Sequence, residues 1–195
     1  MSGNQNDKRD IIIKTAVRLF TDNGFHGTPT SLIARESGIS NGTLFHYFRT
    51  KEALINHIYY DIKGQMAKDI GEGVDSERTV EGKARQIWRN AIVWGINHPD
   101  AYLFIQQFGS SPFIKNVPPE EVMKNAEYAV KVFSELIGKS PLREIDPVIA
   151  FNIIFSPIDV VIKSIITSKE KQDIDLLIDC SFRIMWKSVS DQGDV

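Results

Sequence analysis

The chain of 195 residues contains a single cysteine, Cys180. One cysteine cannot form a disulfide within the chain, which suits a reducing compartment, and we expect Cys180 to be a small buried apolar residue. The N-terminus, MSGNQNDKRD, is polar and lacks the apolar core of a signal peptide. Together these two absences predict a cytoplasmic protein.

Uninterrupted apolar runs are also scarce. The longest apolar stretch, FNIIFSPIDVVIKSIIT at residues 151–167, contains Pro157, Asp159 and Lys163. A membrane span needs about 20 predominantly apolar residues, so this interrupted stretch fits a span poorly and we expect no membrane partner. With 42% apolar and 25% charged residues, the composition is that of a globular protein with a sizeable core.

The motifs of common enzymes and metal sites are missing. The four histidines show no metal-ligand spacing, and the sequence has no HExxH, no CxxC, no phosphate-cradling glycine loop and no Ser/His/Asp pattern. We therefore predict no catalytic residue, no metal and no cofactor. The alternative function is a small helical enzyme or ligand carrier without DNA binding, in which carboxylates or histidines converge from distant helices. Salt-sensitive DNA binding by the N-terminal part would discriminate between the two.

A strong excess of one charge is absent from the whole chain, whose formal net charge is -2. The charges are nevertheless unevenly placed. Residues 1–70 carry nine basic and seven acidic side chains, whereas residues 71–195 carry fourteen and eighteen. This asymmetry favours an anionic partner at the N-terminal end.

What the sequence does contain is helical patterning throughout, with no sustained alternation of the kind that strands need. Apolar residues recur three or four positions apart between glycine, proline and N-cap signals. We therefore predict an all-α fold of about nine helices, four short and then five mostly longer. The expected ranges are Lys8–Asn23, Pro29–Ser37, Asn41–Phe48, a short helix from Lys51, and then residues 76–97, 101–108, 118–138, 146–168 and 173–189.

The second and third predicted helices are joined by only three residues, Gly38-Ile39-Ser40. Glycine permits a tight turn, an apolar residue anchors it, and serine is a good N-cap for the next helix. This arrangement predicts a helix-turn-helix over about residues 29–48. The second helix of such a motif lies in the major groove of DNA.

The outward face of that second helix is suited to DNA. Leu44 and Phe48 are four residues apart and are expected to point inward. Polar and aromatic side chains that can contact base edges or a thymine methyl group then point outward. Gly42 allows close approach of the backbone. Lys51 begins the next helix, where an ammonium group and backbone N–H donors can bind phosphate.

The segments IIKTAVRLF, NGFHGT, IARESGISNGTLFHYF and KEAL, with the spacing between them, closely resemble the DNA-binding domain of the TetR/AcrR family of transcriptional regulators. The resemblance covers roughly residues 8–55. It implies phosphate contacts by Thr28, Ser31, Tyr47 and Lys51. It implies base contacts by Asn41, Gly42, Thr43, Phe45 and His46. Phe45 stands where the family usually has tyrosine, and Asn41 where a basic residue is common.

The resemblance further implies a DNA-binding domain at residues 1–55 and a helical effector-binding and dimerisation domain at residues 56–195, with a fourth helix joining them. The expected protein is a homodimer that binds double-stranded operator DNA, usually as a repressor, and is released by a small-molecule effector. No cluster of buried charge is evident in the C-terminal part, so we expect a largely apolar effector. Concave apolar sites favour aromatic linings, and the candidate pocket residues are Trp88, Trp94, Phe104, Phe108, Tyr128, Phe151 and Phe155.

The last two predicted helices are apolar on more than one face, and such helices need two packing partners. One partner is the core of the chain itself, and the other can be the same helices of a second subunit. The candidate interface residues are Val161, Ile165, Ile178, Phe182 and Met185.

Overall fold

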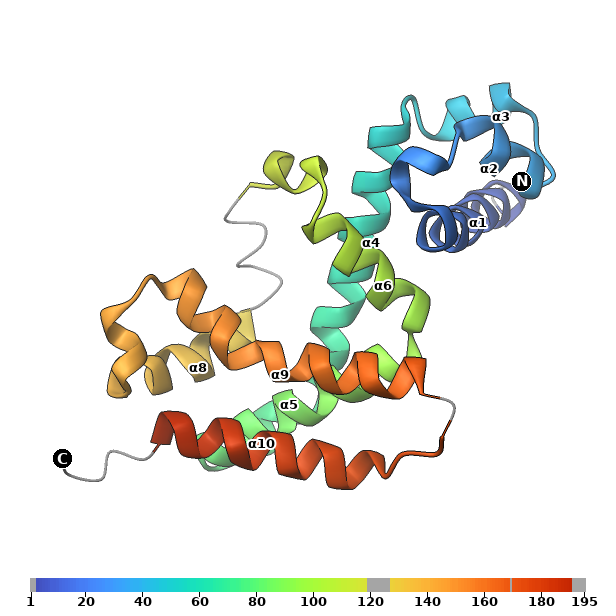
Figure 1. The fold of residues 1–195 in the computed structure, drawn as a ribbon. Helices are drawn as coiled ribbons and strands as arrows, with labels where there is room; N and C mark the ends of the chain where they lie inside the picture. Colours follow the sequence, from blue (N-terminus) through green and yellow to red (C-terminus); the bar gives the residue numbers. More distant parts are fainter. Residues whose placement is uncertain (1–2, 119–126, 169, 191–195) are drawn as a thin grey trace. The chain divides into compact units, whose positions relative to one another are not determined.

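The computed structural model describes residues 3–118, 127–168 and 170–190, and among these residues it contains helices and no strand (Figure 1). The described residues form nine α-helices: α1 (Gly3–Gly27), α2 (Thr30–Glu36), α3 (Asn41–Tyr47), α4 (Lys51–Gly71), α5 (Val80–Asn97), α6 (Pro99–Gly109), α8 (Glu127–Lys139), α9 (Pro147–Thr167) and α10 (Ile174–Ser190). Three short 3₁₀ helices are η1 (Val74–Ser76), η2 (Pro112–Asn116) and η3 (Pro141–Glu144). The all-α prediction is confirmed.

Side-chain caps fix where the longer helices begin. Thr50 Oγ1 accepts a hydrogen bond from Ala53 N at 3.0 Å at the start of α4. Thr79 Oγ1 accepts one from Gly82 N at 2.9 Å at the start of α5. The Asp146 carboxylate accepts a bond of 2.9 Å from the first turn of α9. Each cap satisfies an N–H group that has no partner within the helix, which is worth about 1 kcal/mol.

One helix is much longer than the sequence predicts. The fourth helix was expected to be short, but α4 is 21 residues long. Its apolar residues simply continue in register past Ile62, because no glycine cap or proline ends the helix earlier. Most of the first half of the helix expected over 118–138 lies outside the described residues, and α8 covers its second half.

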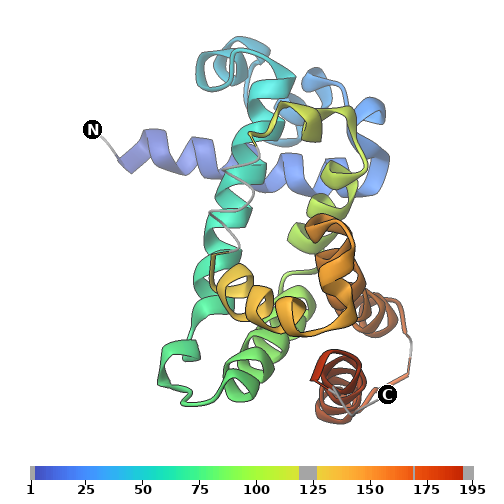
Figure 2. The same cartoon turned by 90° about the vertical axis from the view of Figure 1, so that its left-hand side faces the viewer.

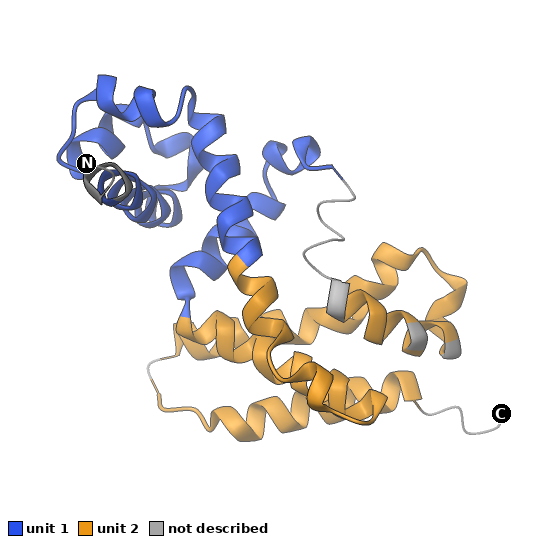
Figure 3. Ribbon diagram, turned by 180° about the vertical axis from the view of Figure 1, so that it is seen from behind, with its two compact units in different colours: residues 1–64, 98–118 blue, residues 65–97, 119–195 orange. Residues whose placement is uncertain are grey.

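Contacts divide the chain into two compact units, coloured separately in Figure 3. Unit 1 comprises residues 1–64 and 98–118, and unit 2 comprises residues 65–97 and 119–195. Helix α4 therefore begins in unit 1 and ends in unit 2. The functional boundary between residues 55 and 56 stays a prediction, because the compact units describe packing and not function.

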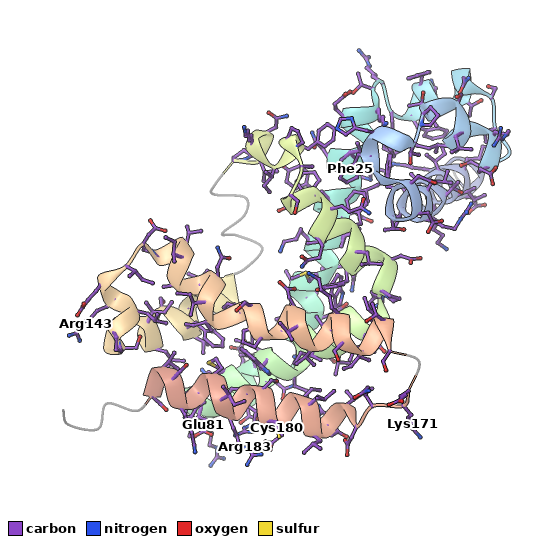
Figure 4. The ribbon with its side chains drawn as sticks, viewed as in Figure 1. Phe25, Glu81, Arg143, Lys171, Cys180 and Arg183 are labelled. Atoms are coloured by element: carbon purple, nitrogen blue, oxygen red, sulfur yellow. The ribbon has the colours of Figure 1, made fainter. Side chains whose placement is uncertain are left out.

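Unit 1 has an aromatic core in which α6 packs on α1. The Phe25 ring, labelled in Figure 4, lies at the centre of this core. Its centroid is 5.2 Å from that of Phe20, 5.3 Å from that of Phe104 and 5.6 Å from that of Phe113. Edge-to-face pairs at these separations are favourable beyond the area that they bury. The helix-turn-helix therefore rests on a rigid base.

Unit 2 is a helical bundle in which α5 packs against α8, α9 and α10, while α10 also packs against α8 and α9. Figure 2 views α10 nearly end-on. The buried Trp88 donates a hydrogen bond from Nε1 to Ser181 Oγ at 3.0 Å, which joins α5 to α10. Arg85 pairs with Asp179 across the same two helices at 2.8 Å. Because that ion pair is exposed, the tryptophan contact and the apolar packing carry most of the stability.

Helix α9 is long and apolar enough to cross a membrane by length and composition alone. The core helix of a soluble bundle has the same properties. Among the described residues, α5 and α10 pack against it, and Phe133 of α8 contacts its Phe155 ring. The interruption by Pro157, Asp159 and Lys163 noted in the sequence lies within this helix.

Candidate DNA-binding site

The turn between α2 and α3 is built as the sequence predicts. Gly38 has φ 67°, a left-handed conformation that favours glycine. Ile39 N then donates to Ala34 O at 3.0 Å and closes the end of α2. Ser40 Oγ accepts a hydrogen bond from Thr43 N at 3.1 Å and begins α3. Local chemistry therefore fixes the angle between the two helices.

Helix α3 has a buried and an exposed face. Leu44 is fully buried in the core of unit 1, and Phe48, which ends the helix, is nearly so. The Phe45 side chain is 43% exposed. The exposed face also carries Asn41, Gly42 and His46, with the half-buried Thr43 and Tyr47 beside them. The predicted base-contacting residues thus lie on one helix, and Phe45 offers an apolar surface to a thymine methyl group.

Thr43 has a second role. Its Oγ1 lies 2.9 Å from Ser40 Oγ, within the cap of α3. A change at Thr43 therefore alters the start of the helix as well as any contact with a base. His46 has no such constraint, because its ring packs only edge-on against Tyr47, with centroids 5.7 Å apart.

Two of the predicted phosphate-binding side chains are accessible. Ser31 is exposed on α2, and Lys51 is half-buried at the start of α4. The Lys51 ammonium lies 6.0 Å from the centroid of the Phe20 ring. Partial burial lowers the pKa of Lys51 and neighbouring Glu52 opposes that shift. Partial burial disfavours the charged form of Lys51, and a phosphate bound beside it would favour that form.

The assignment of the Thr28 side chain to phosphate needs correction. This residue is fully buried. Its hydroxyl lies 3.0 Å from Leu19 O and 2.9 Å from Gly24 O and donates to these carbonyls. The side chain therefore ties the end of α1 to the start of α2 and has no free hydroxyl to offer DNA. The sequence alone did not reveal this, because it does not distinguish a threonine that caps a helix from one whose side chain is buried.

One polar cluster was missed by the sequence analysis. Arg9 of α1 donates a hydrogen bond to His57 Nε2 of α4 at 2.7 Å. The Phe48 ring lies 5.4 Å from the His57 ring and 5.8 Å from the Arg9 guanidinium. These three residues join α1, the end of α3 and α4. Residues 48 positions apart carry no local signal of contact, so only the fold reveals the pair.

The seven candidate pocket residues are not all together. Phe104 and Phe108 lie in the core of unit 1, among the DNA-reading helices. In unit 2, the Phe155 ring lies 6.4 Å from Trp88 and 5.4 Å from Phe151. Trp94 is buried in the same unit, and the side chain of Tyr128 lies outside the described residues. Phe133, which the sequence analysis did not select, packs edge-on against Phe155 at 4.7 Å.

The candidate interface residues mostly point into the chain's own core. Val161, Ile178, Phe182 and Met185 are buried and Ile165 is half-buried. The exposed apolar residues of α9 and α10 form a different set, which includes Ile149, Ile153, Val160, Leu176 and Ile184. Val160 is 67% exposed and Ile184 is 72% exposed. Helices α9 and α10 therefore carry surplus apolar surface, as predicted, but four of the five candidate interface residues are buried in the chain's own core.

Comparison with known proteins extends these observations. A family model described as bacterial regulatory proteins of the tetR family matches residues 12–58. The fatty acid metabolism regulator protein of Bacillus subtilis is 24% identical over 166 residues, covering 84% of this chain and 86% of that protein. A TetR family transcription regulator from Shewanella sp. PV-4 has a similar structure, with a TM-score of 0.78 and 26% identity over 92% of this chain and 96% of that one. The regulator FadR from Bacillus subtilis, solved in complex with stearoyl-CoA, gives a TM-score of 0.65 at 20% identity, over 95% of this chain and 100% of that one.

A helix-turn-helix that exposes polar and aromatic side chains on its second helix, beside a lysine at a helix N-terminus, defines a DNA-binding protein of the transcription regulator class. The matched residues contain the whole motif and the first part of α4. The chain belongs to the TetR family of bacterial transcriptional regulators.

Proposed function

We propose that this protein is a cytoplasmic repressor that binds its operator as a homodimer, leaves it when an acyl effector binds, and has no catalytic activity. The observation that carries the DNA-binding part is the exposed face of α3, with Phe45 and His46 at its surface. Two copies of α3 in a dimer would reach successive major grooves, about 34 Å apart, on a roughly palindromic site.

The effector class is supported by two relatives. One is described as a fatty acid metabolism regulator and the other was solved with stearoyl-CoA. In this chain, unit 2 buries the rings of Trp88 and Phe133 and packs Phe155 against both. An interior of aromatic and aliphatic side chains suits a long apolar chain. We therefore propose a fatty acid or its thioester as the effector.

Selection of bound fragments from genomic DNA would identify the operator and test sequence-specific binding. On the selected site, Phe45→Ala and His46→Ala are expected to lower affinity by about 1–3 kcal/mol for each lost base contact and to change the preferred sequence. Binding to unrelated DNA should remain near the wild-type value. Equal loss on both kinds of DNA would count against base contacts, and selection of no fragment would count against operator binding.

The dimer is supported by the exposed apolar residues of α9 and α10. We propose that Val160 and Ile184 are buried against a second copy of the chain. That copy would cover the exposed apolar side of α9, so its apolar composition does not require a membrane. Val160→Glu and Ile184→Glu should shift the protein from dimer to monomer in analytical ultracentrifugation, because a charge would be buried in an apolar interface. Leu103→Glu, at an exposed leucine of α6, is the matched control and should remain dimeric. A wild-type monomer at micromolar concentration would refute the dimer.

A further inference from the structure

Helix α3, the predicted DNA-reading helix, is too short to hold its own position. It has seven residues, and isolated helices shorter than about 12 residues are marginal in water. The groups that anchor its two ends therefore decide where it lies. The Ser40 cap holds its first turn. At the other end, Phe48 N donates to Leu44 O at 2.9 Å and the Phe48 ring is 5% exposed, so the contacts of this ring fix the end of α3.

The Phe48 ring lies against a pair of polar side chains. The centroid of the His57 ring of α4 is 5.4 Å from that of Phe48, and the Arg9 guanidinium of α1 lies 5.8 Å from the same centroid. Arg9 Nη2 donates to His57 Nε2 at 2.7 Å and lies 3.4 Å from Nδ1. This hydrogen bond joins α1 to α4, and both of its partners lie beside the residue that ends α3. All three residues belong to unit 1.

The protonation of His57 decides whether this bond can form. A guanidinium has donors and no acceptor, so the ring nitrogen that receives its bond must carry a free lone pair. An imidazolium has no such nitrogen and would place a second positive charge beside Arg9. Among the described residues, the charged groups that act on His57 are Arg9 of α1, which opposes protonation, and Asp61 of its own helix, which favours it. The end of α3 presents the uncharged Phe48 ring.

We propose that Arg9 and His57 are positioning residues of the operator-binding site, because their hydrogen bond holds Phe48 and, through it, the end of α3. The proposal rests on operator binding by α3 and adds to it a dependence on pH. Neither side chain has to touch a base. A proton gained by His57 breaks the bond, frees the Phe48 ring to move and weakens binding to the operator.

The direction of the pH dependence follows from the surroundings of His57. Burial, and then the charge of Arg9, lower its pKa below the ordinary value of 6.5, and Asp61 opposes the shift. The bond is therefore intact above about pH 6.5 and is lost as the pH falls through the lower pKa of the folded protein. His46, exposed on α3, would act in the opposite direction, because its imidazolium would attract the phosphates of DNA. The test has to separate these two histidines.

The experiment measures the affinity of the full-length protein for its selected operator and for unrelated DNA by fluorescence anisotropy, between about pH 7.5 and 5.5 at constant ionic strength. His57→Gln is the conservative variant, because glutamine can accept the bond from Arg9 and takes up no proton. His57→Leu removes the acceptor, and Arg9→Met removes the donor. His26→Gln removes an exposed histidine of the same unit and is the matched control. Circular dichroism at each pH checks that every variant is folded.

The quantity compared is the ratio of operator affinity to affinity for unrelated DNA. We expect this ratio to fall in wild type, relative to His57→Gln, by about threefold to tenfold over the pH range, since a proton that binding must displace costs up to about tenfold in affinity per pH unit. Both proteins carry His46, so its own protonation cancels in the comparison. His57→Leu and Arg9→Met should have a lower ratio already at pH 7.5, and His26→Gln should follow wild type.

Three results would overturn the positioning role: wild type and His57→Gln that respond identically to pH, a His57→Leu protein with the wild-type ratio at pH 7.5, or an Arg9→Met protein that loses affinity equally for both DNAs. The last result, with a smaller salt slope, would identify Arg9 as a phosphate contact. If the wild type prefers no DNA fragment at pH 7.5, operator binding itself is wrong, and the positioning role falls with it.

Discussion

Tyr59 of α4 stacks on Phe108 of α6, with ring centroids 4.0 Å apart and ring planes inclined by 14°. Both residues belong to unit 1, and both are almost fully buried. The stack therefore explains why α6 joins the DNA-reading helices in one compact unit although it follows α5 in the sequence. It attaches the middle of α4 to a rigid aromatic core.

Removing this stack should destabilise unit 1. We expect Phe108→Ala to lower the free energy of unfolding by about 3–5 kcal/mol, from lost burial and the cavity left behind. The double variant Tyr59→Ala/Phe108→Ala should reveal a coupling of about 0.5–1.5 kcal/mol beyond the two single effects. Denaturant unfolding followed by circular dichroism measures both quantities. Strictly additive single effects would show that the stack contributes nothing specific.

Lys51→Ala is expected to weaken binding to all DNA sequences about equally, because a phosphate contact carries no sequence information. The slope of log affinity against log salt concentration should fall by about one. Lys68→Ala, on the exposed surface of the same helix, should leave the slope unchanged. Fluorescence anisotropy over a series of salt concentrations measures the slopes. An unchanged slope for Lys51→Ala would remove this residue from the interface.

The helix-turn-helix could be predicted from the sequence because its determinants are local. The positive φ of Gly38 and the cap formed by Ser40 act within four residues of the turn. The inward positions of Leu44 and Phe48 follow from helical spacing, and both are buried as expected. Because these determinants lie close together in the sequence, they can be recognised without the structure.

The predictions that the structure corrects concern contacts between segments far apart in the chain. Helix α10 is apolar on two faces, so periodicity gives its spacing but not which face meets the chain's own core. The structure buries Phe182 and exposes Ile184, and the packing of α5 and α9 makes that choice. The hydroxyl of Thr28 and the pairing of Arg9 with His57 likewise depend on segments far apart in the chain.

Gly95 marks a close crossing of α5 and α9 within unit 2. A Cβ atom at this position would lie 2.5 Å from Ile162 Cδ1 and 3.0 Å from its Cγ1 and Cγ2. Gly95→Ala should therefore cost about 1–3 kcal/mol by overpacking, although alanine favours a helix. Because Trp88, Trp94 and Trp186 all lie in unit 2, tryptophan fluorescence can follow its unfolding.

Two further variants isolate the steric cause. Ile162→Val removes Cδ1, so adding it to Gly95→Ala should recover part of the lost stability. Gly138→Ala places a Cβ in open space in α8 and should stabilise by about 0.5–1 kcal/mol. A Gly95→Ala protein as stable as wild type would show that the two helices separate at little cost.

His57 should make the stability of unit 1 sensitive to acid. A guanidinium can only donate, so His57 accepts the bond from Arg9 at Nε2 as a neutral ring. Burial, and then the charge of Arg9, lower the pKa of His57 below its ordinary value of 6.5, while Asp61 opposes the shift. The unfolded chain therefore takes up this proton more readily than the folded one. The stabilising contribution is present above about pH 6.5 and is lost as the pH falls through the lower, folded pKa.

We expect the thermal midpoint of the wild type to fall between pH 7.5 and 5 more steeply than that of His57→Gln, whose side chain takes up no proton. His26→Gln removes an exposed histidine and should retain the wild-type dependence. Replacing Arg9 by methionine should weaken the dependence as well, because the unfavourable Arg9–His57 charge pair can no longer form. Parallel pH profiles for wild type and His57→Gln would mean that His57 is protonated as easily in the folded protein as in the unfolded chain.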